Sequence, residues 1–217
     1  MIDFAKARRM MVDGQIRPSD VTDHGVIAAM GEVPRERFVP DDLAAVAYLD
    51  RDIPVDPKRS LLKPMVIARM VQALELRDGA KVLDVAGGTG YTAAILARLA
   101  GSVVALEDDA ARSRRCGELV RALGATNVTT VSGPLDAGWP ALAPYDAIII
   151  NGACEVEPQT LLRQLGNGGR LVGVFGTAPA TKATLYRVDN GEIGYRPLFS
   201  AAAPLLPVFA KAPAFVF

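Results

Sequence analysis

Residues 81–91 combine a short apolar stretch, a glycine-rich turn and the start of an apolar helical pattern. The apolar stretch ends at Val85, the turn reads Ala-Gly-Gly-Thr-Gly over 86–90, and apolar residues then recur at helical spacing over 91–99. A strand, a glycine turn and a helix in this order bring backbone N–H groups close to a nucleotide-like ligand. A plain strand-to-helix turn in a parallel sheet has the same local pattern, so both interpretations stay open at this point.

Two carboxylates follow the next apolar stretch. Residues 102–107 predict a second strand, which ends in Glu107 followed by Asp108. Glu107 lies about 20 residues after Gly88, the separation at which an acid grips a ribose diol in nucleotide-binding sheets. Its ionised oxygens would accept both hydroxyl protons in charge-assisted hydrogen bonds. The alternative is a pair of exposed acids at a strand end. The glycine turn and the acids together favour a nucleotide-like ligand.

The composition predicts one domain with no strong charge bias. The chain has 217 residues, 50% of them hydrophobic, with 24 basic and 24 acidic side chains. Basic tracts that would favour nucleic acid or an acidic membrane surface are lacking. We expect no metal site, because the sequence has a single histidine, His24, and because Cys116 and Cys154 are far apart. The N-terminus lacks a signal-peptide core, and no apolar run reaches membrane-spanning length, so we expect a cytoplasmic protein.

The first 80 residues predict helices and connecting segments. The expected elements are a helix over 2–14 broken at 17–20, a second helix capped by Thr22 or Asp23 and stopped by Gly31, an extended connector over 33–40, a short helix over 41–48, a loop over 50–60, and a helix from Pro64 to Leu76.

From residue 80 onward, predicted strands and helices alternate. The expected strands are 81–86, 102–107, 127–132, 145–151 and 169–175, and the expected helices are 91–99, 109–123 and 158–165. This alternation implies a mostly parallel sheet with helices on both faces. Asn190 and Gly191 predict a hairpin between 184–188 and 193–199, and we expect the apolar tail, 205–217, to add an edge element.

The strand over 145–151 ends at Asn151, which should lie near a ligand crevice because open parallel sheets bind ligands beyond the carboxyl ends of their strands. A loop-starting asparagine is the alternative. Two ligand classes compete for the crevice, because residues 88–93 also fit a loose dinucleotide pattern. Little chain remains for the second half of a dehydrogenase, which favours an S-adenosylmethionine enzyme over a nicotinamide one.

Five segments, taken in order, resemble motifs of one family. They are 33–39 (Val-Pro-Arg-Glu-Arg-Phe-Val), 64–70 (Pro-Met-Val-Ile-Ala-Arg-Met), 82–91 with its Gly-Tyr ending, 145–149 (Tyr-Asp-Ala-Ile-Ile) and 165–172 (Leu-Gly-Asn-Gly-Gly-Arg-Leu-Val). Each motif is modest alone, and five in order are hard to obtain by chance. Over nearly its whole length, the chain resembles the protein-L-isoaspartate O-methyltransferases.

The resemblance implies a three-layer α/β, Rossmann-like methyltransferase fold. Its seven-stranded sheet would be mostly parallel, with an antiparallel C-terminal hairpin; residues 1–79 would form a helical extension that caps the substrate side, and 80–217 the unit that binds S-adenosylmethionine. The acceptor would be an isoaspartyl carboxylate in a damaged protein or peptide; the sequence leaves the oligomeric state open. The implied cofactor-binding residues are Asp84, Ala86, Gly87, Gly88, Gly90, Glu107, Asp108, Pro134, Leu135 and Asn151.

The chain departs from the family pattern on the substrate side. Leu62 and Lys63 stand where the family carries Ser-Gln before a proline. Ser60 is the candidate to supply a replacement hydroxyl. Lys63 is a candidate for attracting an anionic substrate, and the alternative is that Lys63 is a solvated lysine at the start of a helix. We therefore take Ser60 and Lys63 as candidate catalytic residues. The candidate substrate-binding residues are Leu62, Lys63, Pro64 and Met65.

Two further departures lie on the cofactor side. Residues 133–135 read Gly-Pro-Leu where the family has Gly-Asp-Gly, and Pro134 cannot replace an aspartate that bonds adenine. Asp136 is a displaced substitute. Ala86 replaces the first glycine of the turn, which is acceptable if its φ is negative.

The expected reaction needs little acid–base machinery. A carboxylate acceptor is ionised at pH 7 and needs no general base, so alignment alone can supply about 7–11 kcal/mol. Two alternatives stay open, a methyltransferase of the same fold with another acceptor and a non-enzymatic member that acts through protein contacts.

Overall fold

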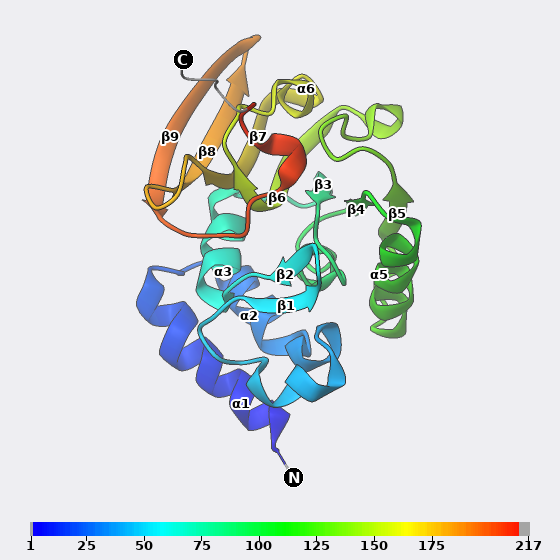
Figure 1. Cartoon of the computed structure of the whole chain (residues 1–217), viewed down its shortest axis with the longest axis vertical. Helices are drawn as coiled ribbons and strands as arrows, with labels where there is room; N and C mark the ends of the chain where they lie inside the picture. Colours follow the sequence, from blue (N-terminus) through cyan, green and yellow to red (C-terminus); the bar gives the residue numbers. More distant parts are fainter. Residues whose placement is uncertain (1, 213–217) are drawn as a thin grey trace.

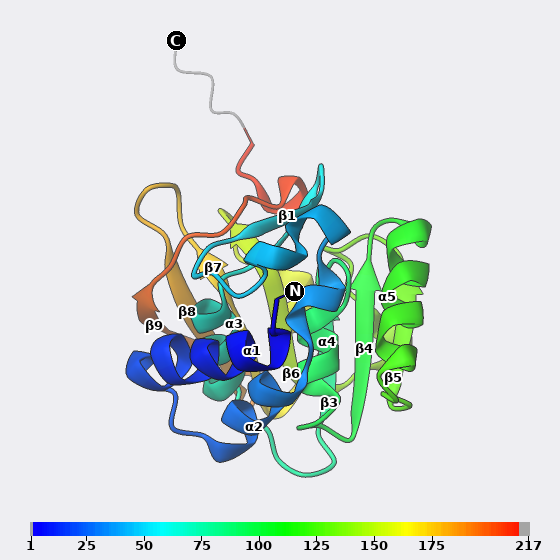
Figure 2. The ribbon, with the colours of Figure 1, turned by 90° about the horizontal axis from the view of Figure 1, so that it is seen from below.

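The computed structural model describes residues 2–212, and its centre is a seven-stranded sheet (Figures 1 and 2). The strand order is β5-β4-β3-β6-β7-β8-β9. The pairs among β3 to β7 are parallel, and β8 and β9 add antiparallel neighbours. This confirms the expected methyltransferase-like sheet. The strands are β3 (Lys81–Val85), β4 (Ser102–Glu107), β5 (Val128–Ser132), β6 (Tyr145–Cys154), β7 (Leu165–Phe175), β8 (Lys182–Asp189) and β9 (Glu192–Ser200).

Apolar side chains cover both faces of the sheet, as parallel strands require. In β3, Val82 joins a large core with the N-terminal helices, while Leu83 and Val85 point into a second core that contains Leu161 and Leu162. The N-terminal helices gather at one end of the molecule (Figure 1). The α-helices are α1 (Phe4–Met11), α2 (His24–Glu32), α3 (Pro64–Ala73), α4 (Tyr91–Leu96), α5 (Ala110–Ala122) and α6 (Gln159–Leu162).

Two predictions for the N-terminal region are wrong. The helix α2 is capped by Asp23, whose Oδ1 accepts from the Val26 N–H, but it passes through Gly31 and ends at Glu32. The ladder continues because the Val33 N–H still reaches the Ala29 carbonyl. The expected extended connector contains a 3₁₀ turn, Arg35–Phe38. The N-terminal region also contains a π-helical turn at Val12–Ile16 and 3₁₀ turns at Arg17–Ser19 and Asp41–Val46.

The segment predicted as a loop over 50–60 is a β-hairpin, which corrects that expectation. Its strands are β1 (Ile53–Asp56) and β2 (Arg59–Leu61), paired antiparallel. The Lys58 N–H bonds the Asp56 carboxylate and closes the turn. Ile53 and Leu61 are paired across the hairpin and both are buried, so two apolar anchors hold a segment whose charges and prolines look like a loop.

The C-terminal region confirms one expectation and corrects another. Asn190 and Gly191 have φ of 50° and 83° and join β8 to β9, as the hairpin signal predicts. The tail does not extend the sheet edge within the described residues, because Leu205 forms a bridge with Ala153 at the end of β6. Part of that expectation, 213–217, lies outside the described residues. Among the helices of 2–212, none has the length and apolarity needed to cross a membrane.

Candidate functional site

The glycine turn is strained where the sequence puts an alanine. Gly88 and Gly90 have φ of +64° and +93°, and Ala86 has φ +59°. The condition of a negative φ at Ala86 is therefore not met, and a left-handed alanine costs about 1–2 kcal/mol. The Ala86 N–H bonds the Leu106 carbonyl at 3.0 Å, which ties the turn to β4 at the residue before Glu107.

Asp84 is buried beneath this turn. Asn151 donates from Nδ2 to Asp84 Oδ1 at 2.6 Å, while Oδ2 has no hydrogen-bond partner within the described residues. A Cβ on Gly87 would stand 2.6 Å from Asp84 Oδ2, so only glycine leaves room for the carboxyl group. Burial raises the pKa of Asp84 to about 7, against the lowering by the Asn151 hydrogen bond.

The raised pKa of Asp84 predicts a pH-dependent stability. Between the unfolded pKa of 3.8 and the folded pKa of about 7, the native carboxyl keeps a proton that the unfolded chain has lost. The Asp84 contribution to the free energy of unfolding should therefore fall by about 3 kcal/mol as pH rises from 4 to 7. Urea titrations at several pH values should show this slope in the native protein and its loss in Asp84→Asn. Parallel stability curves for the two proteins would contradict the assignment.

Glu107 ends β4 opposite the turn, and this chain's own groups already surround it. Its Oε1 accepts from the Gly88 N–H at 2.5 Å. Its Oε2 lies 3.1 Å from Arg59 Nε and 3.2 Å from Arg112 Nη1. Burial raises the pKa of Glu107, and the nearby Arg59 acts in the opposite direction. Asp108 is the more exposed acid and receives Arg59 Nη2 at 2.7 Å and Arg112 Nη1 at 2.6 Å.

The other predicted cofactor residues divide into two groups. Asn151 lies inside β6 and is not a loop starter, and its amide bonds Asp84, the Val85 carbonyl and Thr92. Asn151 therefore belongs with the turn. Pro134 is exposed and Leu135 is buried in the second core, so the Leu135 side chain is a packing group here.

The predicted substrate residues follow one another from β2 into α3. Ser60 is half-buried in β2, opposite Pro54. Leu62 is 1% exposed and its carbonyl accepts from Arg35 Nη2 at 2.7 Å. Lys63 is half-buried, and its N–H bonds Asp52. Pro64 is buried at the start of α3, and Met65 is partly buried against the core.

Three arginines of this region escape prediction from the sequence. Arg59 is buried on Glu107, Arg112 clamps Asp56 of the hairpin at 2.9 Å, and Arg35 is fully buried, with its guanidinium 5.0 Å from the Tyr91 ring centroid. The carboxylate partners of Arg59 are nearly 50 residues away, and Arg35 bonds backbone carbonyls, so local patterns carry no signal of their burial. Arg112 has Asp108 one helical turn away, but its contact with Asp56 joins distant segments. Arg35 falls in the segment 33–39 that carries the family resemblance, which was the one available hint.

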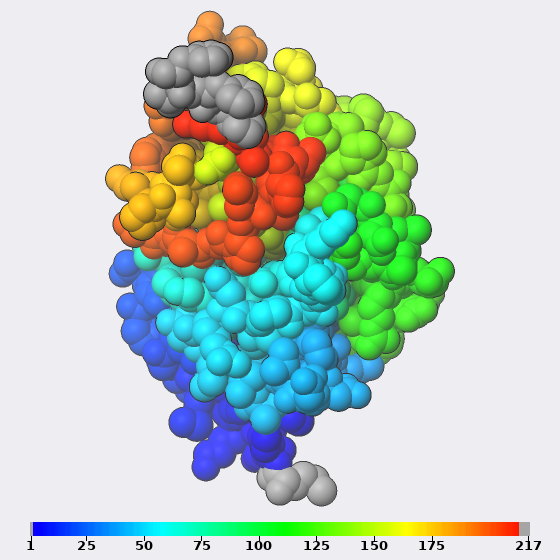
Figure 3. Space-filling model, in the orientation of Figure 1, coloured from blue at the N-terminus to red at the C-terminus, as the bar shows by residue number. Residues whose placement is uncertain are grey.

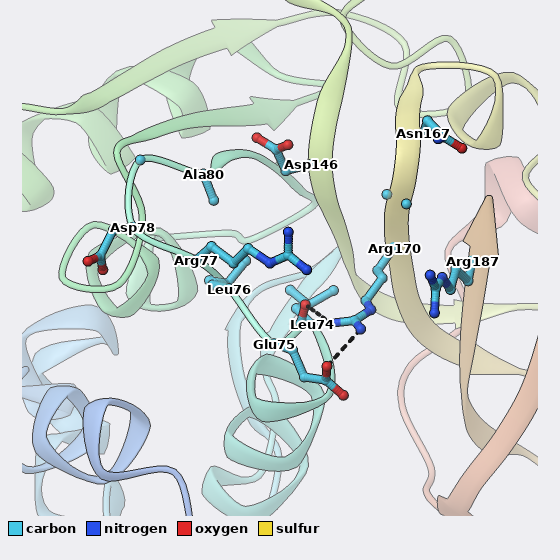
Figure 4. Close-up of a pocket in the computed structure, with 13 residues that line it drawn as sticks. Leu74, Glu75, Leu76, Arg77, Asp78, Ala80, Asp146, Asn167, Arg170 and Arg187 are labelled. Carbon is cyan, nitrogen blue, oxygen red and sulfur yellow. Dashed lines mark hydrogen bonds and ion pairs between the residues drawn. The ribbon is translucent and has the colours of Figure 1, made fainter. Parts of the chain in front are cut away.

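A separate hollow of about 340 Å³ lies at the end of the strands opposite to the glycine turn (Figure 4). It is lined at the amino ends of β3, β6 and β7, and Arg170 crosses it to bond Glu75 at 2.7 Å and the Leu74 carbonyl at 3.0 Å. Arg77 and Asp146 face the same space, so its charges are mixed. This hollow shares no residue with the glycine turn.

Comparison with known proteins decides the family. The model of the protein-L-isoaspartate(D-aspartate) O-methyltransferase family matches residues 6–199, which is most of the chain. The chain belongs to this family. A protein-L-isoaspartate O-methyltransferase of Methylorubrum extorquens is 39% identical over 217 residues, covering 95% of this chain and 94% of the relative. One named protein-L-isoaspartate O-methyltransferase 2, from Anaeromyxobacter, is 44% identical over 76% of this chain and 68% of its own.

Solved structures of the isoaspartate methyltransferase family have the same fold. One structure is titled protein-L-isoaspartate O-methyltransferase and matches with a TM-score of 0.79 and 25% sequence identity. The match covers 91% of this chain but only 65% of the other protein's length. A Plasmodium falciparum protein, described as a complex with S-adenosyl-L-homocysteine, has a TM-score of 0.79 at 18% identity and covers 93% of this chain and 98% of its own. That second likeness concerns the fold.

The residues around the glycine turn fit S-adenosylmethionine, the donor of the isoaspartate methyltransferase family, in part. The glycine turn is formed, a carboxylate stands at the end of β4, and the unpartnered Asp84 Oδ2 lies beneath the turn. Glu107 is the group that would hold the ribose hydroxyls. Both oxygens of Glu107 are engaged within the chain, so the ribose would have to replace an internal partner.

Proposed function

We propose that the protein transfers a methyl group from S-adenosylmethionine to the carboxylate of L-isoaspartyl residues in damaged proteins. The observation that carries the proposal is the glycine turn of 86–90 set against Glu107, in a chain that belongs to this family. The relatives bear the corresponding name at about 40% identity over most of the chain. One solved relative is titled as a complex with S-adenosyl-L-homocysteine, which supports the choice of donor.

The donor supplies a methyl group that its sulfonium already activates. The chain's own part is to hold donor and acceptor in line. Backbone N–H groups of the turn and the carboxylate of Glu107 would hold the nucleoside, with Asp84 and Asn151 keeping the turn in shape. Because an acceptor carboxylate is ionised at pH 7, no side chain has to remove a proton. Alignment therefore carries the catalysis.

The acceptor side is formed by residues 1–79 in this proposal, as a cap on the donor-binding unit, 80–217. The hairpin β1–β2 supports this placement, because Val55 and Arg59 lie against Gly88. Ser60 and Lys63 would face the acceptor, and Leu62, Pro64 and Met65 would shape its path. Cys116 and Cys154 are both buried and unpaired within 2–212, which suits a reducing compartment and supports a cytoplasmic location.

A labelled-methyl assay tests the acceptor. An isoaspartyl peptide should take up base-labile label from S-adenosylmethionine, and the same peptide with normal aspartate should take up at least a hundredfold less. If label enters other proteins but neither peptide, the natural acceptor is a group other than the isoaspartyl carboxylate. The presence of Leu62 and Lys63 in place of the family's Ser-Gln favours this alternative. Absence of label from every acceptor would contradict the enzymatic function.

A paired substitution tests the acceptor side more sharply. The Leu62→Ser/Lys63→Gln variant should show kcat/KM for the isoaspartyl peptide about fivefold above that of Leu62→Ala/Lys63→Gln, since one hydroxyl hydrogen bond is worth about 1 kcal/mol. Leu62 is buried, so both variants lose the same packing and differ by the hydroxyl. Equal kcat/KM values would remove Leu62 from the acceptor site.

A further inference from the structure

We propose that Arg59 sets the affinity for the methyl donor by occupying, from inside the chain, the carboxylate that the donor's ribose needs. The inference rests on the proposed function, because it assumes that the donor binds at the glycine turn. Arg59 opens β2 and is buried, with its side chain 2% exposed, and it reaches Glu107, whose side chain is 3% exposed. The two residues are 48 positions apart in the sequence and meet over the turn.

Arg59 uses all three of its guanidinium nitrogens in this position. Nε lies 3.1 Å from Glu107 Oε2, Nη2 lies 2.7 Å from Asp108 Oδ1, and Nη1 donates to the Lys58 carbonyl at 2.9 Å. A fork of donors on two carboxylates has directional strength that a lysine lacks. Arg59 is therefore held in one position by three contacts and is part of the interior of the site, unlike a solvent-exposed side chain.

The same contacts exclude a ribose from Glu107. Oε1 accepts the Gly88 N–H, and Oε2 accepts from Arg59 and Arg112. A diol that donates to those oxygens therefore has to take the place of one of these donors, and Arg59 is the one whose side chain lies over the turn. The space above the turn is filled as well, because a Cβ on Gly88 would stand 3.4 Å from Val55 Cγ2 and 3.7 Å from Arg59 Cβ.

The hairpin that carries Arg59 is fastened to the sheet by a second ionic contact. Arg112 of α5 lies 2.9 Å from Asp56 of β1 through Nε and reaches Glu107 and Asp108 through Nη1. Figure 3 shows the hairpin (cyan) at the surface between α5 (green) and the C-terminal segment (red). Pro54 and Lys58 of the hairpin are exposed, so in this proposal Arg59 leaves Glu107 towards the solvent side of the hairpin.

Donor binding then competes with an internal cation. The apparent dissociation constant equals the intrinsic one divided by the fraction of molecules in which Arg59 has left Glu107. Because the ion pair is buried and hydrogen-bonded, that fraction is small in the free protein. Removing the guanidinium should raise it towards one and tighten donor binding, while the glycine turn and Glu107 remain in place.

Calorimetric titration with S-adenosylhomocysteine tests this competition without an activity assay. We expect Arg59→Gln to bind at least tenfold more tightly than the native protein. The matched control is Lys58→Gln, which removes the same charge from the exposed neighbouring position of the same turn. Its dissociation constant should stay within twofold of the native value.

The outcomes separate this proposal from the proposed function. Equal or weaker binding by a folded Arg59→Gln variant overturns the role of Arg59 and leaves the methyltransferase assignment intact. Absence of binding at millimolar ligand in both proteins overturns both. If Arg59→Gln does not fold, Arg59→Lys replaces it with an expected gain of about threefold. In the native protein, the Arg59 Nε–H NMR resonance should lose its protection from solvent exchange when the ligand binds, and an unchanged resonance counts against the proposal.

Discussion

We expect that replacing Glu107 by glutamine lowers the free energy of unfolding by about 3 kcal/mol. The substitution leaves Arg59, whose side chain is 2% exposed, without its most deeply buried partner, and breaking a buried ion pair from one side typically costs about 3–5 kcal/mol. The amide oxygen can still accept the Gly88 N–H, which places the loss at the lower end. Urea denaturation followed by circular dichroism measures this change.

Asp108→Asn is the matched control for Glu107→Gln. Asp108 pairs with the same two arginines, but its side chain is 39% exposed, so its loss should cost less than about 1 kcal/mol. Equal losses from the two variants would mean that burial of Glu107 does not decide the energy. In the Arg59→Gln background, where the Arg59 guanidinium no longer competes, Glu107→Gln should weaken S-adenosylhomocysteine binding at least tenfold, because charge-assisted hydrogen bonds to the ribose are lost.

Gly90→Ala should destabilise the protein by about 2–6 kcal/mol, for two separable reasons. Gly90 has φ +93°, and holding an alanine there costs about 1–3 kcal/mol. Its Cβ would also stand 2.5 Å from the Sγ of the buried Cys116, an overpacking that adds about 1–3 kcal/mol. Urea denaturation should show the loss, and S-adenosylhomocysteine binding should weaken because α4 begins at the displaced turn.

A double-mutant cycle separates the two reasons at Gly90. Cys116→Ala removes the sulfur that the new Cβ meets, so Gly90→Ala should cost less in that background by the overpacking part alone. Gly14→Ala serves as the matched control, because a Cβ at Gly14 meets nothing within 4 Å, and it should leave stability unchanged or raise it slightly. Additive effects of Gly90→Ala and Cys116→Ala would contradict the proposed contact.

The sequence was sufficient to predict the sheet and the proximity of Glu107 to the glycine turn. Alternating apolar strands and helices, with a turn rich in glycine, are local patterns, and the separation of Gly88 and Glu107 matches the geometry of neighbouring parallel strands. Asn190-Gly191 likewise specifies its hairpin locally. The positions of the strands and the meeting of Glu107 with the turn follow from these patterns.

The hairpin over the turn could not be predicted in the same way. Residues 50–60 contain prolines and charges, and the burial of Ile53 and Leu61 depends on the N-terminal helices that cover them. Arg59 is buried because Glu107 and Asp108, nearly 50 residues away, neutralise it. The positive φ of Ala86 has the same origin, since the position is set by the bond of its N–H to Leu106 in a neighbouring strand.

A crystal structure of the protein with S-adenosylhomocysteine would show whether the nucleoside takes the place of Arg59 on Glu107. We expect the nucleoside over the glycine turn, both ribose hydroxyls within hydrogen-bond distance of Glu107, and the Arg59 guanidinium moved away from that carboxylate. A nucleoside bound elsewhere, or one bound at the turn while Arg59 still holds Glu107, would contradict it.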